Sequence, residues 1–160
     1  MPPDGPCSLW AARRESVCRR EYGRPVASYE VVVASGSLRA SPDDSTPFAH
    51  RWTHSGVTVQ TSFTGAHLLH LAVAGCVLND VHREAQGLGV PLEGVRVVAR
   101  GGFDEDWSST GISYEVEVDS AASAAEVDAL LARVDDVAEI PRAVRRATTV
   151  RRVRVDTPKA

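Results

Sequence analysis

The 160-residue sequence predicts an α+β fold in which antiparallel sheets pack on a long buried helix. Three observations predict it. Residues 28–63 are rich in β-branched residues and are interrupted by turn residues, which is typical of short strands. Residues 64–86 hold an apolar run with the length of a buried helix. Residues 112–119 alternate between apolar and polar side chains, as a strand with one buried face does. The resulting order of strands, helix, strands, helix and strand is that of an α+β domain.

Length and charge limit the class of protein. A chain of this length makes one domain with a core of its own, and we place that domain at residues 28–160. Residues 1–27 carry five arginines without a sustained period and are predicted to be a poorly ordered extension. The net charge of -3 gives no general attraction to nucleic acid or to an anionic membrane. Neither is therefore a predicted partner.

The cysteines and the motifs limit the location and the chemistry. Cys7, Cys18 and Cys76 lack metal-ligand spacing, and no signal-peptide region precedes them, so a reducing, cytoplasmic setting is expected. The longest apolar run, Leu71–Leu78, is too short to span a bilayer. No nucleotide-binding motif is found, so no cofactor is predicted. Two histidine pairs lack a third metal ligand, so no metal is predicted: His50 with His54, and His67 with His70.

Three strands are expected before the first helix. The first begins at Ser28 and breaks at Gly36, and the next two form a hairpin that turns at Ser55-Gly56. Alternation along the hairpin predicts one face on each strand. The first face holds His50, Trp52 and His54, and the second holds Val57, Val59, Thr61 and Phe63.

The first helix is expected to begin at Thr64-Gly65 and to run through Gln86, where Gly87 and Gly89 close it. Apolar residues cover every side of its first half. Such a helix is buried rather than laid on a surface. Its one cysteine, Cys76, lies near the middle of the apolar run "HLLHLAVAGCVLND".

Two strands, a helix and a closing strand follow. The strand at 112–119 points its acidic residues outward. Ser123 and Glu126 predict a capping box at the start of an amphipathic helix that breaks at Pro141. The closing strand lies at 148–157, and its arginines are expected to sit across from the outward acids. Acids of this neighbouring strand and of the amphipathic helix can pair with the basic cluster, which is therefore read as an internally paired face.

The order and three sequence segments resemble the OsmC/Ohr family over about residues 28–156. The segments are the helix "HLLHLAVAGC", the strand region "GVPLEGVRVVARGGFD" and the interrupted helix "AEIPRAV". The resemblance implies an intertwined homodimer in which dimerisation buries the central helix. It also implies that the thiolate of Cys76 attacks an organic hydroperoxide, becomes a sulfenic acid, and is resolved by a second cysteine. Since only the thiolate reacts, a nearby cation is needed, and Arg51 on the hairpin is the candidate.

Two departures from the family pattern bear on that chemistry. Where the resolving cysteine precedes a proline, this chain has Ile140 before Pro141, so an internal disulfide cannot form there. Ten residues before the nucleophile, where hydroperoxide-reducing members have a glutamate, it has Ala66. The resemblance then implies resolution by an external thiol, with Cys18 as the alternative.

The residues around Cys76 leave alternatives open. An unpaired cysteine in an apolar helix also packs as a small hydrophobe. Asp80 lies one helical turn on, where it could act as a general base or form a salt bridge with Arg83. If the hairpin packs on the helix, Trp52, His54, Cys76 and Asp80 share a pocket, with His54 as the base for the thiol.

Three functions follow, in this order. The first is a thiol-dependent, peroxiredoxin-like enzyme that reduces organic hydroperoxides in oxidative stress, through Cys76 with Arg51, His54 and Asp80 at the site. The second is an OsmC-like protein without peroxidase activity that binds or transforms a small apolar metabolite at the dimer interface. The third is a structural dimer without catalysis.

Overall fold

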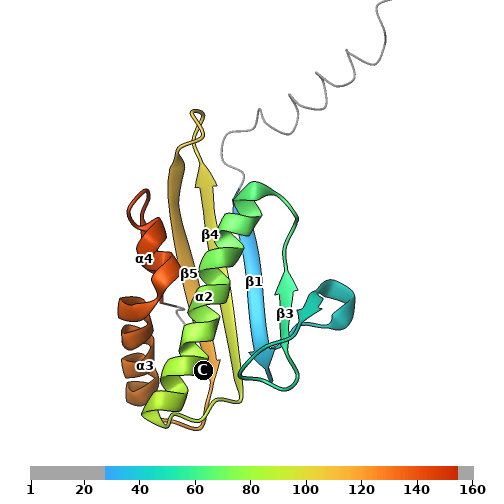
Figure 1. The fold of residues 1–160 in the computed structure, drawn as a ribbon, viewed down its shortest axis with the longest axis vertical. Helices are drawn as coiled ribbons and strands as arrows, with labels where there is room; N and C mark the ends of the chain where they lie inside the picture. Colours follow the sequence, from blue (N-terminus) through green and yellow to red (C-terminus); the bar gives the residue numbers. More distant parts are fainter. Residues whose placement is uncertain (1–27, 155–160) are drawn as a thin grey trace, which may run out of the picture.

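The structure, a computed structural model, describes residues 28–154. In this range a six-stranded sheet is covered on one face by helices, and the longest helix, α2, crosses the middle of the sheet (Figure 1). No helix between residues 28 and 154 has the length and apolar character needed to cross a membrane. The extension predicted for residues 1–27 lies outside the described residues.

The α+β prediction is confirmed, and the arrangement of strands is more specific than the sequence indicated. Neighbouring strands follow the order β2-β3-β1-β4-β5-β6. The strands are β1 (Tyr29–Gly36), β2 (Thr46–Phe48), β3 (Val57–Gln60), β4 (Gly94–Phe103), β5 (Ser109–Asp119) and β6 (Val150–Arg152). The helices are the short 3-10 helix η1 (Pro42–Asp44), α2 (Gly65–Leu88), α3 (Ala124–Val137) and α4 (Glu139–Val144).

The prediction of purely antiparallel sheets is wrong at one edge. β5 and β6 pair in parallel, with Ile112 opposite Val150, and the strands form one mixed sheet. A parallel neighbour requires a long crossover connection, and α3 with α4 supplies it by crossing the helical face of the sheet. This crossover brings the start of α4 against α2.

Helix α2 begins and ends where its capping residues predict. The hydroxyl of Thr64 accepts a hydrogen bond from the backbone N–H of His67, and Gly89 adopts a left-handed conformation with φ of 70°. The expected closing residue Gly87 lies inside the helix, which continues to Leu88.

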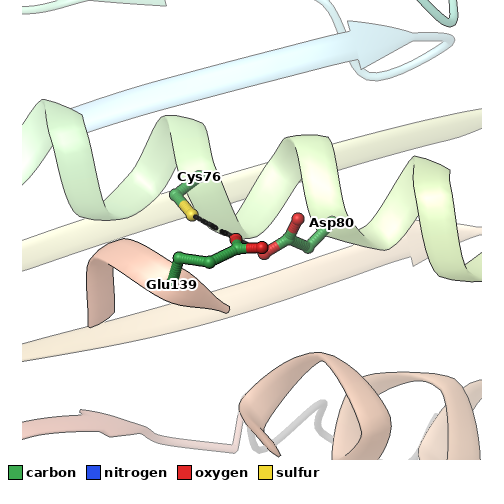
Figure 2. A group of neighbouring side chains, drawn as sticks. All are labelled: Cys76, Asp80 and Glu139. Carbon is green, nitrogen blue, oxygen red and sulfur yellow. Dashed lines mark hydrogen bonds between the residues drawn. The ribbon is translucent and has the colours of Figure 1, made fainter. Parts of the chain in front are cut away.

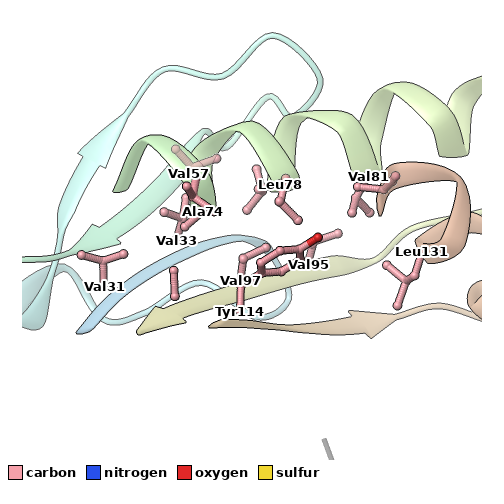
Figure 3. Packing of buried hydrophobic residues seen from close by; sticks show 14 of the residues in the cluster. Val31, Val33, Val57, Ala74, Leu78, Val81, Val95, Val97, Tyr114 and Leu131 are labelled. Carbon is pink, nitrogen blue, oxygen red and sulfur yellow. The ribbon is translucent and has the colours of Figure 1, made fainter. Parts of the chain in front are cut away.

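The core lies between α2, α3 and the helical face of the sheet (Figure 3). Alternate residues of β1, β4 and β5 point toward α2, while the opposite face carries ion pairs such as Arg100 with Glu115. The predicted inward side chains Ile112 and Tyr114 are buried, with 1% of each exposed. The core residues are Val31, Val33, Val57, Val59, Val73, Ala74, Val77, Leu78, Val81, Val95, Val97, Ala99, Leu130, Leu131 and Val134, among others.

The predicted hairpin is only partly right. β2 and β3 pair, and a turn bonds Gly56 N–H to the Thr53 carbonyl, but the first strand is Thr46–Phe48. Residues 49–56 form a loop, so their alternating pattern does not describe a strand. β3 also ends at Gln60, and 89% of Phe63 is exposed.

The predicted break of the last helix lies three residues earlier, at Ala138, between α3 and α4. Pro141 sits in the first turn of α4, where a missing N–H leaves no helical bond unmade. The expected pairing of the basic cluster is confirmed for an acid of the helix and is wrong for the acids of β5. Arg152 bonds to Asp135 of α3, and the acids pair with arginines of β4.

Candidate functional site

Cys76 lies at the middle of α2, on the side that faces the start of α4 (Figure 2). Its Sγ atom is 3.6 Å from Oδ2 of Asp80 and 3.9 Å from Oε2 of Glu139. The thiol is partly exposed, whereas only 2% of Asp80 is. The sulfur therefore points at two carboxylates.

Two separate elements bring these groups together. Asp80 follows Cys76 by one helical turn, so both side chains leave α2 in the same direction. Glu139 is the first residue of α4, and the break at Ala138 turns the chain so that α4 starts against α2. Ile140 and Pro141 follow directly, and the backbone of Ile140 forms a hydrogen bond with Cys76, so the position to which the resemblance assigns a resolving cysteine lies beside the thiol.

Arg83 supplies the positive charge of this site, and it contacts the carboxylates. Its Nη1 atom is 2.9 Å from Oδ1 of Asp80 and 3.4 Å from Oε1 of Glu139. Its Nε atom bonds to Glu84 at 3.0 Å. Among residues 28–154, no cation forms a hydrogen bond with the sulfur of Cys76.

Burial and the nearby carboxylates keep the thiol protonated. Desolvation is the main cause that raises the pKa of Cys76, and the charges of Asp80 and Glu139 raise it further, against a backbone hydrogen bond at Ile140 that lowers it. The pKa of Asp80 is also raised, mainly by burial, although Arg83 opposes this. Since the thiolate is the reactive form, Cys76 is a weak nucleophile at neutral pH.

Cys76, Asp80 and Glu139 also form a set of possible metal ligands. One ligand atom from each lies within 4.8 Å of the others. Zinc accepts thiolate and carboxylate ligands, but Arg83 already bridges the two carboxylates. A metal would have to displace this guanidinium, so the donor set fits an ion poorly.

A neighbouring side of α2 borders a cavity of about 680 Å³. It lies between the second half of α2, the loop at 49–56 and the chain that leads into β4. The side chains that line it come from these three segments. They are Arg51, Trp52, His82, Arg83, Ala85, Gln86, Val90 and Leu92.

His82 is the buried polar group of this cavity, with 9% of its surface exposed. Its Nε2 atom lies 2.9 Å from the hydroxyl of Ser35 on β1. Burial, with a smaller contribution from nearby His50, lowers the pKa of His82 to about 4. The imidazole is therefore neutral at pH 7.

A second hollow of about 330 Å³ continues along α2 toward its middle. Arg51 and Trp52 line both hollows, and Gly75 and Asn79 of α2 line the second one. His50 holds the loop against the helix through a 3.1 Å hydrogen bond between its Nε2 and Asn79 Oδ1. The loop and α2 thus form the two walls of one elongated depression.

The structure brings together two of the four residues that the sequence proposed. Cys76 and Asp80 are in contact, and Asp80 forms the salt bridge with Arg83 that was one of its suggested roles. Arg51 stacks on Trp52, with its guanidinium carbon 5.7 Å from the ring centroid, and lines the cavity. His54 is exposed in the loop. Within the described range, no hydrogen bond or ion pair joins Arg51 or His54 to Cys76.

Sequence reasoning missed Glu139 and His82. Glu139 stands next to the isoleucine that replaces the family's resolving cysteine, and this position was the available signal. His82 lies within the predicted helix but outside its apolar first half, and nothing in its spacing indicated a cavity.

Fold and site together define a class of protein. It is an α+β protein with a cysteine on a helix that crosses a six-stranded sheet and faces a short helix containing a proline. The sequence model of the OsmC-like protein family matches residues 58–152. Because this match covers more than half of the chain, the protein belongs to the OsmC family.

Solved structures share the fold at low sequence identity. An OsmC-like protein from Mycoplasma pneumoniae matches with a TM-score of 0.54 and 12% identity, over 78% of this chain and 94% of that chain. A hypothetical protein from Aquifex aeolicus VF5 matches with a TM-score of 0.52 and 12% identity, over 81% and 96%. An organic hydroperoxide resistance protein OsmC from Legionella pneumophila matches with a TM-score of 0.49 and 14% identity, over 72% and 98%. A comparison with curated protein sequences finds no match.

Proposed function

We propose that this OsmC family member binds a small apolar molecule in the cavity beside α2 and does not work as a peroxidase. The observation that carries the proposal is the cavity of about 680 Å³ with a buried, neutral His82 and apolar side chains in its wall. Its size is within the range of small-molecule sites, which are mostly apolar with a few convergent polar groups. Trp52 supplies an aromatic surface at the same place.

The environment of Cys76 supports the second half of this proposal. A peroxidatic cysteine needs a stabilised thiolate, whereas this sulfur faces two carboxylates and its pKa is raised. Arg83, the nearest cation, bonds to the carboxylates. The thiol in this reading is a hydrogen-bond donor that helps to hold α4 on α2.

Reduction of organic hydroperoxides is the second candidate. The observation that favours it is the partly exposed Cys76 beside Ile140 and Pro141, the family's reactive position. An external thiol would then complete the cycle, because Ile140 cannot form a disulfide.

We also propose that two copies associate through the outer surface of α2. Leu68, Ala72 and Gly75 follow one another at helical spacing on the side of α2 that the sheet does not cover, and 38% of Leu68 is exposed. Burial of this apolar stripe by a second copy would complete the buried central helix. Leu68→Glu should then shift the mass measured by multi-angle light scattering from dimer to monomer, whereas Ala132→Glu on the exposed surface of α3 should not.

Ligand binding is tested by NMR titration with a neutral apolar probe, naphthalene-1-carboxamide. Shifts are expected at residues 51–52, 82–86 and 90–92. Gln86→Trp should weaken them, because Gln86 is exposed and lines the cavity, so the larger ring occupies part of it without disturbing the core. Ala132→Trp is the matched control on α3. Absence of shifts in the wild type with this amide would reject binding of a neutral apolar molecule.

The peroxidase candidate is tested in a Cys7→Ser, Cys18→Ser background, where Cys76 is the one remaining thiol. We expect no turnover of an organic hydroperoxide with an excess of dithiothreitol, and no trapping of a sulfenic acid by dimedone. Turnover that disappears in Cys76→Ser would establish the second candidate in place of the first.

A further inference from the structure

The walls of the cavity beside α2 carry positive charge without negative charge. Arg51 and Arg83 both line it, and no aspartate or glutamate does. The third titratable group, His82, is neutral at pH 7. A ligand in this cavity therefore meets two guanidinium groups and no carboxylate of the wall, and the one without an ion pair among residues 28–154 is that of Arg51, since Arg83 pairs with Asp80, Glu84 and Glu139.

The two guanidinium groups are held in different ways. Arg83 bonds to Asp80, Glu84 and Glu139 through its Nε and Nη1 atoms. Within residues 28–154, no partner bonds to its Nη2 atom, which leaves part of the guanidinium for a ligand. These carboxylates lie outside the cavity wall and fix the orientation of the arginine.

Arg51 forms no ion pair within residues 28–154, and its guanidinium stacks on the ring of Trp52. This contact positions the charge next to a flat aromatic surface. A guanidinium is the side chain best suited to planar carboxylates, which it can bind through two parallel hydrogen bonds. A single ligand would therefore bind the guanidinium of Arg51 through its carboxylate and the ring of Trp52 through a flat group.

The remaining wall restricts the rest of the ligand. Ala85, Val90 and Leu92 are apolar, and Gln86 offers an amide at the exposed side. The ring of Trp52 favours a flat group, since aromatic rings stack with an offset on planar partners. The volume of about 680 Å³ is larger than a single ring requires.

We infer that the cavity binds a small organic anion, with its carboxylate between Arg51 and Arg83 and a flat apolar body on Trp52. This inference rests on the proposed binding function and adds the charge and the shape of the ligand.

The experiment compares two probes of equal shape, naphthalene-1-carboxylate and naphthalene-1-carboxamide, by isothermal titration calorimetry with the full chain. We expect the carboxylate to bind at least about tenfold more tightly than the amide at low salt, as for one charge-assisted hydrogen bond. Added sodium chloride should weaken binding of the carboxylate and leave the amide unchanged.

Variants assign the charge preference to the cavity. Arg51→Gln should lower the affinity for the carboxylate more than the affinity for the amide, so that the preference for the carboxylate is lost. Arg96→Gln removes an arginine from the opposite face of the sheet, where it pairs with Glu117, and should retain the preference. NMR shifts at residues 82–86 locate the bound probe.

The results separate the two proposals. Equal affinities of wild type for both probes would overturn the anion inference and leave the binding function standing. No binding of either probe would remove both. A carboxylate preference that survives in Arg51→Gln but disappears in Arg96→Gln would place the anion on the other face and also overturn the inference.

Discussion

The two sides of helix α2 offer different chemistry, although their residues are close neighbours in the sequence. One side presents Cys76 to Asp80 and Glu139, where negative charge opposes formation of a thiolate. The other side presents His82 to a cavity lined by two arginines. The side with the cysteine thus disfavours the thiolate, and the cavity side has the features of a binding site.

Arg83 connects the two sides. It lines the cavity, and it also neutralises Asp80 and Glu139. A guanidinium bound to carboxylates cannot also stabilise the thiolate beside them. Arg83 therefore links the carboxylates beside the thiol to the wall of the cavity, whereas burial is the main cause of the raised thiol pKa.

The largest expected effect is the loss of stability at low pH that His82, on the cavity side of α2, causes. The pKa of His82 is lowered from 6.5 to about 4. As the pH falls, His82 therefore takes up a proton in the unfolded state before it does so in the folded state. Stability is therefore lost as the pH falls from 6.5 toward 4, by about 3 kcal/mol at pH 4. Urea denaturation at pH 7 and pH 4 should show this loss, and His82→Gln should show a smaller one. His54→Gln, at an exposed histidine, should behave as wild type; an equal loss in His82→Gln would contradict the assignment.

The next effect tests the thiol side. Arg83→Met leaves the buried Asp80 carboxylate, whose side chain is 3% exposed, without its cation. Loss of one partner of a fully buried pair costs about 3–5 kcal/mol, and since 40% of the Arg83 side chain is exposed, we expect about 2 kcal/mol, allowing for solvent screening.

The pH dependence of Arg83→Met provides its internal check. The pKa of Asp80 is already raised, and it rises further without Arg83. A raised carboxyl pKa stabilises the fold at low pH and loses this contribution as the pH increases. Urea denaturation should thus show a larger defect at pH 8 than at pH 5. Arg96→Met, which breaks an exposed pair, should cost about 1 kcal/mol or less at either pH.

A smaller effect concerns the reactivity of the Cys76 thiol. In the background without Cys7 and Cys18, alkylation by iodoacetamide should still accelerate as the pH passes 8.5, the ordinary thiol pKa. Asp80→Asn and Glu139→Gln remove charges that raise the thiol pKa, so both should react faster than wild type at pH 7.5. Glu117→Gln, on the far face of the sheet, should react as wild type does. A rate that reaches its plateau below pH 7.5 would mean that the thiolate is stabilised after all.

The smallest effect concerns Arg51. Its guanidinium stacks on Trp52, and an exposed cation–π contact is worth about 0.5–1 kcal/mol. Arg51→Gln should thus change the free energy of unfolding by no more than this amount in urea. A larger loss would mean that Arg51 holds the loop in place, and that its effect on ligand binding is indirect.

Local rules predicted much of the fold. Thr64 and Gly89 mark the ends of α2, and Ser123 with Glu126 forms the expected capping box, because helix ends depend on bonds within a few residues. The alternation at 112–119 identified the buried face of β5. The prediction of a strand within residues 49–56 is wrong because these alternating residues do not pair with a neighbouring strand, and strand pairing depends on two segments.

In the candidate site, too, some contacts follow from the local sequence and others only from the tertiary structure. Helical spacing alone placed Asp80 beside Cys76, and the sequence also determined that an isoleucine, which cannot form a disulfide, precedes Pro141. Only the tertiary structure decided that Glu139 faces the sulfur, that Arg83 bonds to carboxylates, and that Arg51 and His82 border one cavity. These contacts join residues that are far apart in the chain, and the position of the loop and of the crossover helices on α2 depends on packing across the whole sheet. The charge around Cys76 is thus a consequence of the fold, even though the cysteine itself is evident in the sequence.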